Sequence, residues 1–511
     1  MRILISNPDS LGDFVLRQPM IAALTAEGHE VQLVVRDFVS PLTALLFPEI
    51  PLLHCPGDPY SPGFTLESRA GTELLARLRG FSPDLLVAAP HQYTRLEEEL
   101  ALAIPETPTL ALSGPLYAGD PGEGHAPQPQ ISFRDRVVVA ADAPELLKNE
   151  QLASRILGRH VVLPRPAIEV GNDIRKQTRT RLRSLGFERG MYWIACVGDT
   201  SYTQIRNWGA ANWTAFFAAM LRQTDATVMF VGTPEESPAV ERIRDALGPL
   251  AQRTVNCSSE PDGIEALLGL IDGAAGYIGK DTGPMHFAAA LGKPVLAIFG
   301  GGTWPRFIPA APVGVALTVT VPCSPCGWRC HVQDSWCVKT VPVEPALAAF
   351  DRILRGELTA FEVIEMEAPA TLIHRMVHES SDRYVTVIRQ YAQVVKELHR
   401  ASPAGPSRDP AEQAGAAMGG ATEPVSAPSE PPQVVAAALE ASAAAAAELA
   451  ELRGRTLELQ AQIEEKSLEA ATLARLLPVL RDEIDHLTLE PLPAPQSNPW
   501  HGLLRRLRRS N

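Results

Sequence analysis

The chain has 511 residues, enough for about three domains, and 45% of them are hydrophobic, which allows sizeable buried cores. Lys and Arg number 46 against 59 Asp and Glu, and the resulting net charge of −13 argues against a protein that binds nucleic acid over a broad surface. We expect no transmembrane helix, because no apolar run approaches about 18 residues. The first apolar run is too short for a signal peptide, so we expect a cytoplasmic protein whose seven cysteines are thiols or metal ligands.

The first lobe is predicted to span residues 1–175, where short apolar runs alternate with helical patterns. Strands are predicted at 2–6, 31–35, 52–54, 84–89 and 137–141, and helices at 13–26 and 73–79. A segment rich in Gly and Pro, 114–130, predicts a loop. This alternation favours a parallel sheet with helices on both faces, as in a Rossmann-like lobe.

A basic helical stretch at 175–185 is expected to lead into a second α/β lobe, which we place at 176–400. Strands are predicted at 192–198, 226–232, 276–279 and 294–299, and helices at 212–223, 236–247 and 263–272. The stretch 344–400 is expected to be helical, with 382–399 returning to the first lobe. Two doubly wound lobes in tandem predict a binding site in the cleft between them, at the carboxyl ends of the strands.

The last part of the chain has three predicted segments. Residues 401–435 are dense in Pro, Ala, Gly, Ser and Glu and predict a disordered linker. Residues 436–490 carry apolar residues at most heptad a and d positions and predict a coiled coil that self-associates, although Pro478 should kink or break it. One amphipathic helix packed on the rest of the protein is the alternative. The basic amphipathic tail, 491–511, could touch anionic lipid on the inner face of the cytoplasmic membrane; a solvated basic end explains it equally well.

The richest motif is the stretch 279–294, in which an apolar strand leads through Asp-Thr-Gly-Pro into an Ala-rich helix. Asp281 or Thr282 can cap this helix, Pro284 suits its first turn, and His286 lies close enough to face the same ligand. The free N–H groups at such a helix start favour an anion such as a diphosphate. The next strand ends in the glycines at 300–302, so two loops from adjacent strands predict a nucleotide site; a generic strand-to-helix turn is the alternative.

This stretch is similar to the C-terminal signature of glycosyltransferase family 9, the heptosyltransferase family of GT-B enzymes. That signature reads Asp-Ser/Thr-Gly-Pro-x-His-x-Ala-x-Ala, followed by Gly-x-Pro and a strand that ends in a glycine loop. The resemblance covers roughly residues 1–350 in motif order. It implies an inverting transferase that moves a sugar from a nucleotide diphosphate, bound by the second lobe, to a hydroxyl acceptor held by the first. ADP-heptose with an acceptor in the lipopolysaccharide core is the family's best-known case.

The loop after the first strand, 9–15, is similar to the family's Ile-Gly-Asp segment. By that resemblance Asp13 is the general base, since a carboxylate within hydrogen-bond distance can take the proton of the attacking hydroxyl. A plain helix N-cap is the alternative role for Asp13, and Asp9 is the second choice as base.

The remaining donor contacts also follow from the resemblance. Thr200 and Ser201 match hydroxyl donors to the diphosphate, and Arg206 stands where the family usually has Lys and can bind phosphate with two N–H groups. Glu236, with Glu235 as second choice, matches an acidic contact to the ribose. The full donor set is Thr200, Ser201, Arg206, Glu236, Asp281, Thr282, Gly283 and His286. The alternative for Arg206 is a surface arginine beside a core tryptophan. The alternative for Glu236 is a solvated acidic residue at a helix start.

No Asp-x-Asp pair stands at a strand end to hold Mg²⁺, so we expect the leaving diphosphate to be neutralised by Arg206, the hydroxyls and the helix start, without an obligatory metal. A separate cluster, Cys323, Cys326, Cys330 and Cys337, places four thiols within fifteen residues. Four thiolates suit structural zinc or iron, and the resemblance adds that a protein-glycosylating subgroup is thought to hold iron there. Reduced, partly buried cysteines or occasional disulfides are the alternative.

Several other functions stay open. A protein O-glycosyltransferase of the same family would take a protein acceptor in place of a glycolipid. A nucleotide-sugar 2-epimerase would share the architecture, and a degenerate lobe assembled by the coiled coil would be a binding module without activity. A Rossmann oxidoreductase is disfavoured because no Gly-x-Gly-x-x-Gly follows the first strand.

Overall fold

A computed structural model of the chain describes residues 1–372 except 62, 91–92, 114–132, 134, 141, 188–191, 199–203, 259–262, 322–323, 325, 328–329, 331–334 and 370. The chain divides into two units, Met1–Pro403 and Ala404–Asn511, and every described residue belongs to the first. The predicted return helix, linker, coiled coil and basic tail lie outside the described residues and stay predictions. None of the described helices is long and apolar enough to cross a membrane.

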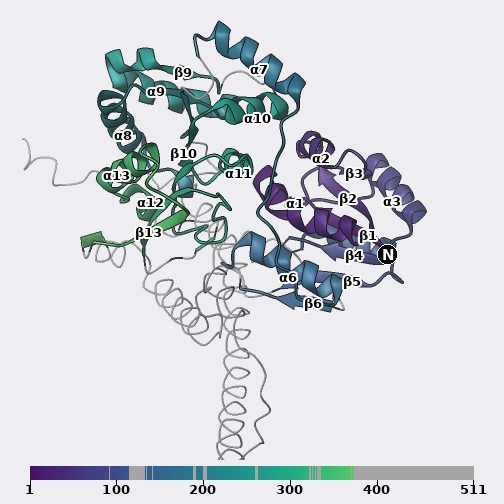
Figure 1. The fold of residues 1–511 in the computed structure, drawn as a ribbon. Coiled ribbons are helices and arrows are strands. Elements are labelled where there is room, and N and C mark those ends of the chain that lie inside the picture. Colours follow the sequence, from purple (N-terminus) through teal and green to yellow (C-terminus); the bar gives the residue numbers. More distant parts are fainter. Residues whose placement is uncertain are drawn as a thin grey trace, which may run out of the picture. The chain divides into compact units, whose positions relative to one another are not determined.

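The first lobe is built on a parallel sheet whose described strands run in the order β3-β2-β1-β4-β5-β6 (Figure 1). Its strands are β1 Arg2–Asn7, β2 Glu30–Arg36, β3 Leu52–Cys55, β4 Leu85–Ala88, β5 Thr109–Ser113 and β6 Asp135–Val138. Its helices are α1 Leu11–Ala26, α2 Ser40–Leu46, α3 Arg69–Phe81, α4 Arg95–Ala103 and α6 Glu145–Leu157.

Strand β1 is central, and its side chains explain why helices cover both faces of the sheet. Ile3 and Ile5 point into one core cluster together with Phe14 of α1, while Leu4 points into another together with Leu74 of α3. Alternate residues of a strand face opposite sides, so a strand buried on both faces reads as a continuous apolar run. The run therefore fixes β1 in the middle of the sheet, with α1 starting directly above its carboxyl end.

The second lobe repeats this architecture with a parallel sheet in the order β13-β12-β11-β10-β7-β8-β9 among the described strands. The strands are β7 Tyr192–Cys196, β8 Thr227–Phe230, β9 Thr254–Asn256, β10 Gly276–Lys280, β11 Val295–Ile298, β12 Gly314–Thr320 and β13 Phe361–Glu367. The α-helices are α7 Asn172–Ser184, α8 Ala210–Gln223, α9 Ser237–Leu247, α10 Gly263–Gly273, α11 Gly283–Ala290, α12 Trp336–Lys339 and α13 Val343–Leu354. Short 3-10 turns occupy Gln204–Arg206, Pro234–Glu236 and Gly248–Arg253.

An aromatic cluster on one face of this sheet anchors the loop that follows β7. Trp208 and Trp213 meet edge to face with ring centroids 4.6 Å apart, and Phe216 of α8 packs against both. The indole Nε1 of Trp208 donates a 2.7 Å hydrogen bond to the carbonyl of Val341. Because Trp208 is fully buried and bonded, the turn that carries Arg206, two residues earlier, is held to the lobe.

The predicted α/β class with two tandem Rossmann-like lobes is confirmed, and one sequence expectation about the second lobe is wrong. The stretch 344–400 was expected to be helical throughout, but α13 ends at Leu354 and is followed by Gly356 in the left-handed region (φ 68°). The chain then forms β13, which pairs in parallel with β12 at the edge of the sheet. The strand predicted at 137–141 lies earlier, at Asp135–Val138.

Candidate active site

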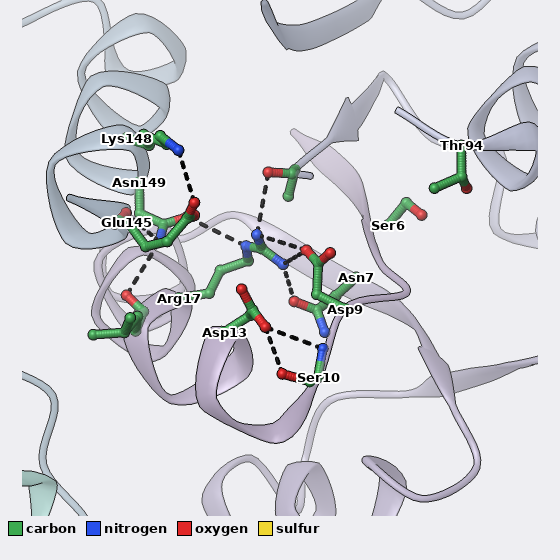
Figure 2. A network of polar contacts seen from close by, with 12 residues as sticks. Ser6, Asn7, Asp9, Ser10, Asp13, Arg17, Thr94, Glu145, Lys148 and Asn149 are labelled. Carbon is green, nitrogen blue, oxygen red and sulfur yellow. Dashed lines mark hydrogen bonds and ion pairs between the residues drawn. The ribbon is translucent and has the colours of Figure 1, made fainter. Parts of the chain in front are cut away.

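Asp13 lies in the first turn of α1, directly after the loop that follows β1. Its Oδ2 accepts hydrogen bonds from the backbone N–H of Ser10 (3.2 Å) and from the Ser10 hydroxyl (2.6 Å). Its Oδ1 has no hydrogen-bond partner among the described residues, and Figure 2 shows this oxygen directed away from Ser10. The N-cap of α1 is Ser10 and not Asp13, which is the third residue of the helix and bonds back to Ser10. This bond and the role of base are compatible, because each would use a different oxygen of the same carboxylate.

The surroundings of Asp13 raise its pKa from 3.8 to about 6. Burial is the largest cause, and the negative charges of Asp9 and Glu145 add to it, whereas Arg306 and the Ser10 hydroxyl act in the opposite direction. A general base works best when its pKa approaches the working pH, because it is then both ionised and basic. The environment of Asp13 therefore suits proton abstraction better than that of an ordinary surface carboxylate.

Asp9, the second choice as base, is held on both oxygens. Its Oδ2 accepts from Nη1 (3.0 Å) and Nη2 (3.1 Å) of the fully buried Arg17, and its Oδ1 accepts from the hydroxyl of Tyr60 (2.5 Å). Arg17 also donates to the side chains of Asn7 and Asn149, as Figure 2 shows. Both oxygens of Asp9 are thus occupied by Arg17 and Tyr60, whereas Asp13 keeps one oxygen open, so the geometry favours Asp13 as the base.

A second buried ion pair lies beside Asp13, and no sequence motif predicts it. Glu145, at the start of α6, accepts at Oε1 from Lys148 Nζ (2.8 Å) and from Arg306 Nε (2.6 Å). Its backbone N–H also donates to the carbonyl of Arg306 (2.9 Å). Burial opposes ionisation of Glu145, but Lys148 and Arg306 outweigh it and hold its pKa well below the usual range. Burial and Arg306 lower the pKa of Lys148 to about 8.

The stretch from Asp281 to His286, which is predicted to bind the donor and is called the donor motif below, lies where β10 passes into α11. Asp281 Oδ2 accepts a 2.8 Å hydrogen bond from the hydroxyl of Thr303, which follows the glycines at 300–302. Arg206 reaches the same residue, with Nη1 3.0 Å from the Asp281 carbonyl and Nε 3.5 Å from Oδ2. The structure thus brings together Arg206, Asp281 and the glycine loop, which come from three separate stretches of sequence.

Thr282 is the N-cap of α11 in an extended conformation, but its side chain makes no capping hydrogen bond. Its hydroxyl points instead to Cys196 Sγ at 3.6 Å. The expectation that Thr282 or Asp281 would cap the helix by its side chain therefore does not hold for Thr282. Without a side-chain cap on Thr282, N–H groups of the first turn remain available to an anionic ligand.

His286 links this motif to the first turn of α1. Its side chain is buried, and burial lowers its pKa to about 4, so the imidazole is neutral near neutral pH. Its Nδ1 has no hydrogen-bond partner among the described residues. The ring packs on Gly12, where an added Cβ would lie 2.8 Å from His286 Cδ2 and 3.6 Å from Gly283 Cα. The residue next to Asp13 therefore touches the donor motif directly, and only a glycine allows this approach.

Glu236 is buried, which excludes the reading of a solvated acidic helix start for this residue. Its Oε1 accepts from Lys280 Nζ (2.8 Å), and its Oε2 accepts from the backbone N–H of Thr233 (2.9 Å). A Cβ at Gly198 or at Gly232 would overlap the Glu236 side chain. Two glycines and a buried lysine thus fix the Glu236 carboxylate at the carboxyl ends of β7, β8 and β10; its contact with a ribose stays a prediction.

Three predicted site residues, Thr200, Ser201 and Cys323, lie outside the described residues. Of the other cysteines, Cys326 and Cys337 are buried, and Cys337 Sγ accepts a hydrogen bond from the N–H of Gly301 (3.3 Å). Among the described residues no group of three or more His, Cys, Asp or Glu side chains could hold a metal ion. Cys326, Cys330 and Cys337 by themselves therefore do not form a metal site.

The comparisons with known proteins agree with this geometry. The family model described as Glycosyltransferase family 9 (heptosyltransferase) matches residues 118–336, a range that contains Arg206, Glu236 and the motif from Asp281 to His286. The chain carries a glycosyltransferase family 9 domain. The protein is therefore a glycosyltransferase, and a nucleotide-sugar epimerase or a Rossmann oxidoreductase is disfavoured. No curated protein sequence matches this chain.

Two solved structures share the fold with this glycosyltransferase. One is the ADP-heptose lps heptosyltransferase II of E. coli, which is 16% identical, with a TM-score of 0.52 over 70% of this chain and 99% of that one. The other is a glycosyl transferase family 9 protein from Veillonella parvula DSM 2008, 15% identical, with a TM-score of 0.53 over 70% of this chain and 97% of that one. These likenesses show that the two lobes form a GT-B fold.

Proposed function

We propose that this glycosyltransferase transfers a sugar, with inversion, from a nucleotide diphosphate to a hydroxyl acceptor, and that Asp13 is its general base. One observation carries the proposal: Gly12, next to Asp13, lies against His286 and Gly283 of the donor motif. The residue that would activate the acceptor and the residues that would bind the donor therefore belong to one site.

In the proposed reaction Asp13 Oδ1 takes the proton of the acceptor hydroxyl while the hydroxyl oxygen forms a bond to the anomeric carbon. The bond from that carbon to the diphosphate breaks, and its electron pair leaves with the diphosphate. Attack from the face opposite the leaving group inverts the anomeric centre. A pKa of about 6 leaves Asp13 largely ionised near neutral pH and still more basic than an ordinary aspartate.

The leaving diphosphate gains one negative charge when its bond to the sugar breaks, and the site must stabilise this charge. We propose that Arg206, the hydroxyls of Thr200 and Ser201, and the N–H groups at the start of α11 do this without an obligatory metal ion. The neutral imidazole of His286 would accept or donate a hydrogen bond through Nδ1 once the donor is bound. Such fixed donors typically contribute about a hundredfold to a thousandfold each to turnover.

The sugar that we favour is a heptose carried by ADP, with an acceptor in the lipopolysaccharide core or another glycoconjugate. Support comes from the family model and from the fold shared with the E. coli ADP-heptose lps heptosyltransferase II. A protein hydroxyl is the alternative acceptor, which the four-cysteine segment favours through the family resemblance. Elemental analysis of purified protein for zinc and iron, with a Cys326→Ser variant for comparison, tests whether that segment holds a metal.

The direct experiment measures release of nucleoside diphosphate from ADP-heptose and from common UDP-, GDP- and dTDP-sugars in the presence of candidate acceptors. Asp13→Asn should reduce turnover by about a hundredfold to ten-thousandfold with little change in donor affinity. Asp84→Asn is the matched control, because Asp84 is a half-exposed carboxylate of the same lobe paired with Arg2. Near-normal turnover in Asp13→Asn would remove Asp13 from the mechanism.

We also propose a domain arrangement and a location for the rest of the chain: lobes at 1–175 and 176–400, a linker at 401–435, a self-associating coiled coil at 436–490 and a basic tail at 491–511 on the inner face of the cytoplasmic membrane. Deletion after Arg400 should leave a monomer that still binds the donor. A truncated protein that sediments as the full chain does would contradict self-association through the coiled coil.

A further inference from the structure

Five charged side chains of the described residues lie around the proposed base, and together with Asp13 itself they form a cluster of six whose charges balance. The acidic members are Asp9, Asp13 and Glu145, and the basic members are Arg17, Lys148 and Arg306. Five of the six belong to the first lobe; Arg306, in the segment after β11, is the one contributed by the second lobe. Without Arg306, three carboxylates would share a buried region with two cations.

Arg306 is fixed to the first lobe at two points rather than placed there by charge alone. Its Nε donates to Glu145 Oε1 (2.6 Å), and its backbone carbonyl accepts from the N–H of Glu145 (2.9 Å). Its guanidinium lies 4.8 Å from the ring centroid of Phe307, and its side chain is only 12% exposed. A guanidinium held by a charge-assisted hydrogen bond and an aromatic ring, on a backbone that is itself hydrogen-bonded, acts on its neighbours from a defined position.

We propose that Arg306 is a positioning residue: its two hydrogen bonds with Glu145 hold it in the charge cluster around Asp13. The second lobe, which would bind the donor, thereby supplies the positive charge that keeps the base ionised. This inference rests on the proposed role of Asp13. It adds that proton abstraction requires the donor lobe in place, because the acceptor lobe alone does not balance its own carboxylates.

The groups that face Asp13 act on its pKa with known signs. From its own loop and helix, Asp9 raises this pKa and the Ser10 hydroxyl lowers it; from α6, Glu145 raises it; from the second lobe, Arg306 lowers it. His286 of α11 packs on the adjacent Gly12, and its lowered pKa of about 4 keeps it uncharged above that pH. Glu145 and Arg306 are thus bonded to each other but act on Asp13 in opposite directions.

This opposition gives the test. Arg306→Gln removes a cation and should move the acid limb of the turnover profile to higher pH, whereas Glu145→Gln removes an anion and should move it to lower pH, each by roughly half a unit or more. Arg306→Lys keeps the charge and should restore most of the wild-type profile. Arg352→Gln is the control, since Arg352 pairs with Glu362 at the partly exposed α13–β13 surface.

If the contact between Arg306 and Glu145 were merely structural, its loss would lower activity equally at all pH values and would not shift the acid limb of the turnover profile. Unshifted limbs in folded Arg306→Gln and Glu145→Gln, or shifts in the same direction, would overturn the inference. If Glu145→Gln does not fold, the comparison of Arg306→Gln with Arg306→Lys decides: a limb that moves in the first and returns in the second supports the proposal, and equal limbs refute it.

The failure of the proposed function would look different. If Asp13→Asn retains turnover, Asp13 is not the base, whatever the other variants do. The ionisation of Asp13 can be followed without turnover, as the pH dependence of the stability difference between wild type and Asp13→Asn. The midpoint of that difference should rise in the Arg306→Gln background and fall in the Glu145→Gln background, and an unchanged midpoint in both would overturn the inference even if Asp13 is the base.

Discussion

Asp13→Asn should make the protein more stable near neutral pH while it strongly reduces transfer. The folded-state pKa of Asp13 is raised from 3.8 to about 6 because the side chain is buried beside Asp9 and Glu145. A raised pKa in an acid means that the folded state favours the protonated form. The contribution of Asp13 to wild-type stability is therefore most favourable below its unfolded pKa and is lost as the pH rises through the interval from 3.8 to about 6.

The magnitude follows from the size of that interval. A shift of about two units corresponds to roughly 3 kcal/mol, since one unit is about 1.4 kcal/mol. An asparagine has nearly the same shape, carries no charge and escapes this cost, but it weakens the charge-assisted hydrogen bonds from Ser10, which offsets roughly 1 kcal/mol. We expect a net gain of about 1–2 kcal/mol, or a few degrees in the melting temperature of a protein with domains of this size.

The assay is thermal unfolding of wild type and Asp13→Asn over a series of buffers from about pH 4 to about pH 8. The two curves should approach each other at the acid end, separate as the pH rises from 3.8 to about 6, and run parallel above that, with the variant more stable. Asp84→Asn in the same series should show no such gain, because that carboxylate lies at the surface beside Arg2. A variant that is less stable near neutral pH, or a difference that does not depend on pH, would refute the reasoning about Asp13.

Further predictions concern the contacts around the site. Gly12→Ala places a methyl group 2.8 Å from the ring of His286, so it should weaken binding of nucleotide diphosphate and cost about 1–3 kcal/mol of stability. Gly80→Ala is the control: Gly80 lies in open space on α3, and the substitution should stabilise the protein by about 0.5–1 kcal/mol. A nucleotide titration measures the binding and an unfolding curve measures the stability. Equal effects of the two substitutions would contradict the packing argument. Lys280→Met leaves the buried Glu236 carboxylate without its cation and should cost about 3–5 kcal/mol, much of it recovered by adding Glu236→Gln. Denaturant midpoints of the single and double variants check this, and additive losses would disprove the coupling. The acid limb of the turnover profile should lie at about pH 6, the pKa of the base, and a limb well away from it would assign the titration to another group.

The local parts of this site could be predicted from the sequence, because a short pattern determines them. The run at 2–6 and the following Leu-Gly-Asp predicted β1 and the start of α1, and the Asp-Thr-Gly-Pro-Met-His stretch predicted α11 with its open first turn. Arg206 was also found from its local segment, and the structure brings it to Asp281.

The parts that the sequence could not predict depend on contacts between distant residues. Glu145 and Arg306 are 161 positions apart, and each is an isolated charge in a segment without a motif, so no local pattern pairs them. No local pattern marks Lys280, because its burial beside Glu236 depends on the glycines that follow two other strands. β13 was read as helix because its three glutamates and four apolar residues fit a helical face as well as a strand, and only its pairing with β12 decides between them.

The most direct test of the central claim is calorimetric binding of nucleoside diphosphates to the full chain, with ADP, UDP, GDP and dTDP compared at one ionic strength. We predict selective binding of one of them, ADP in the favoured case. Binding should be lost in Arg206→Ala and retained in Arg352→Ala, because Arg352 pairs with Glu362 away from the site. Folded protein that binds none of these nucleotides, or that binds one equally well in Arg206→Ala, would contradict the assignment of this site to a nucleotide-sugar donor.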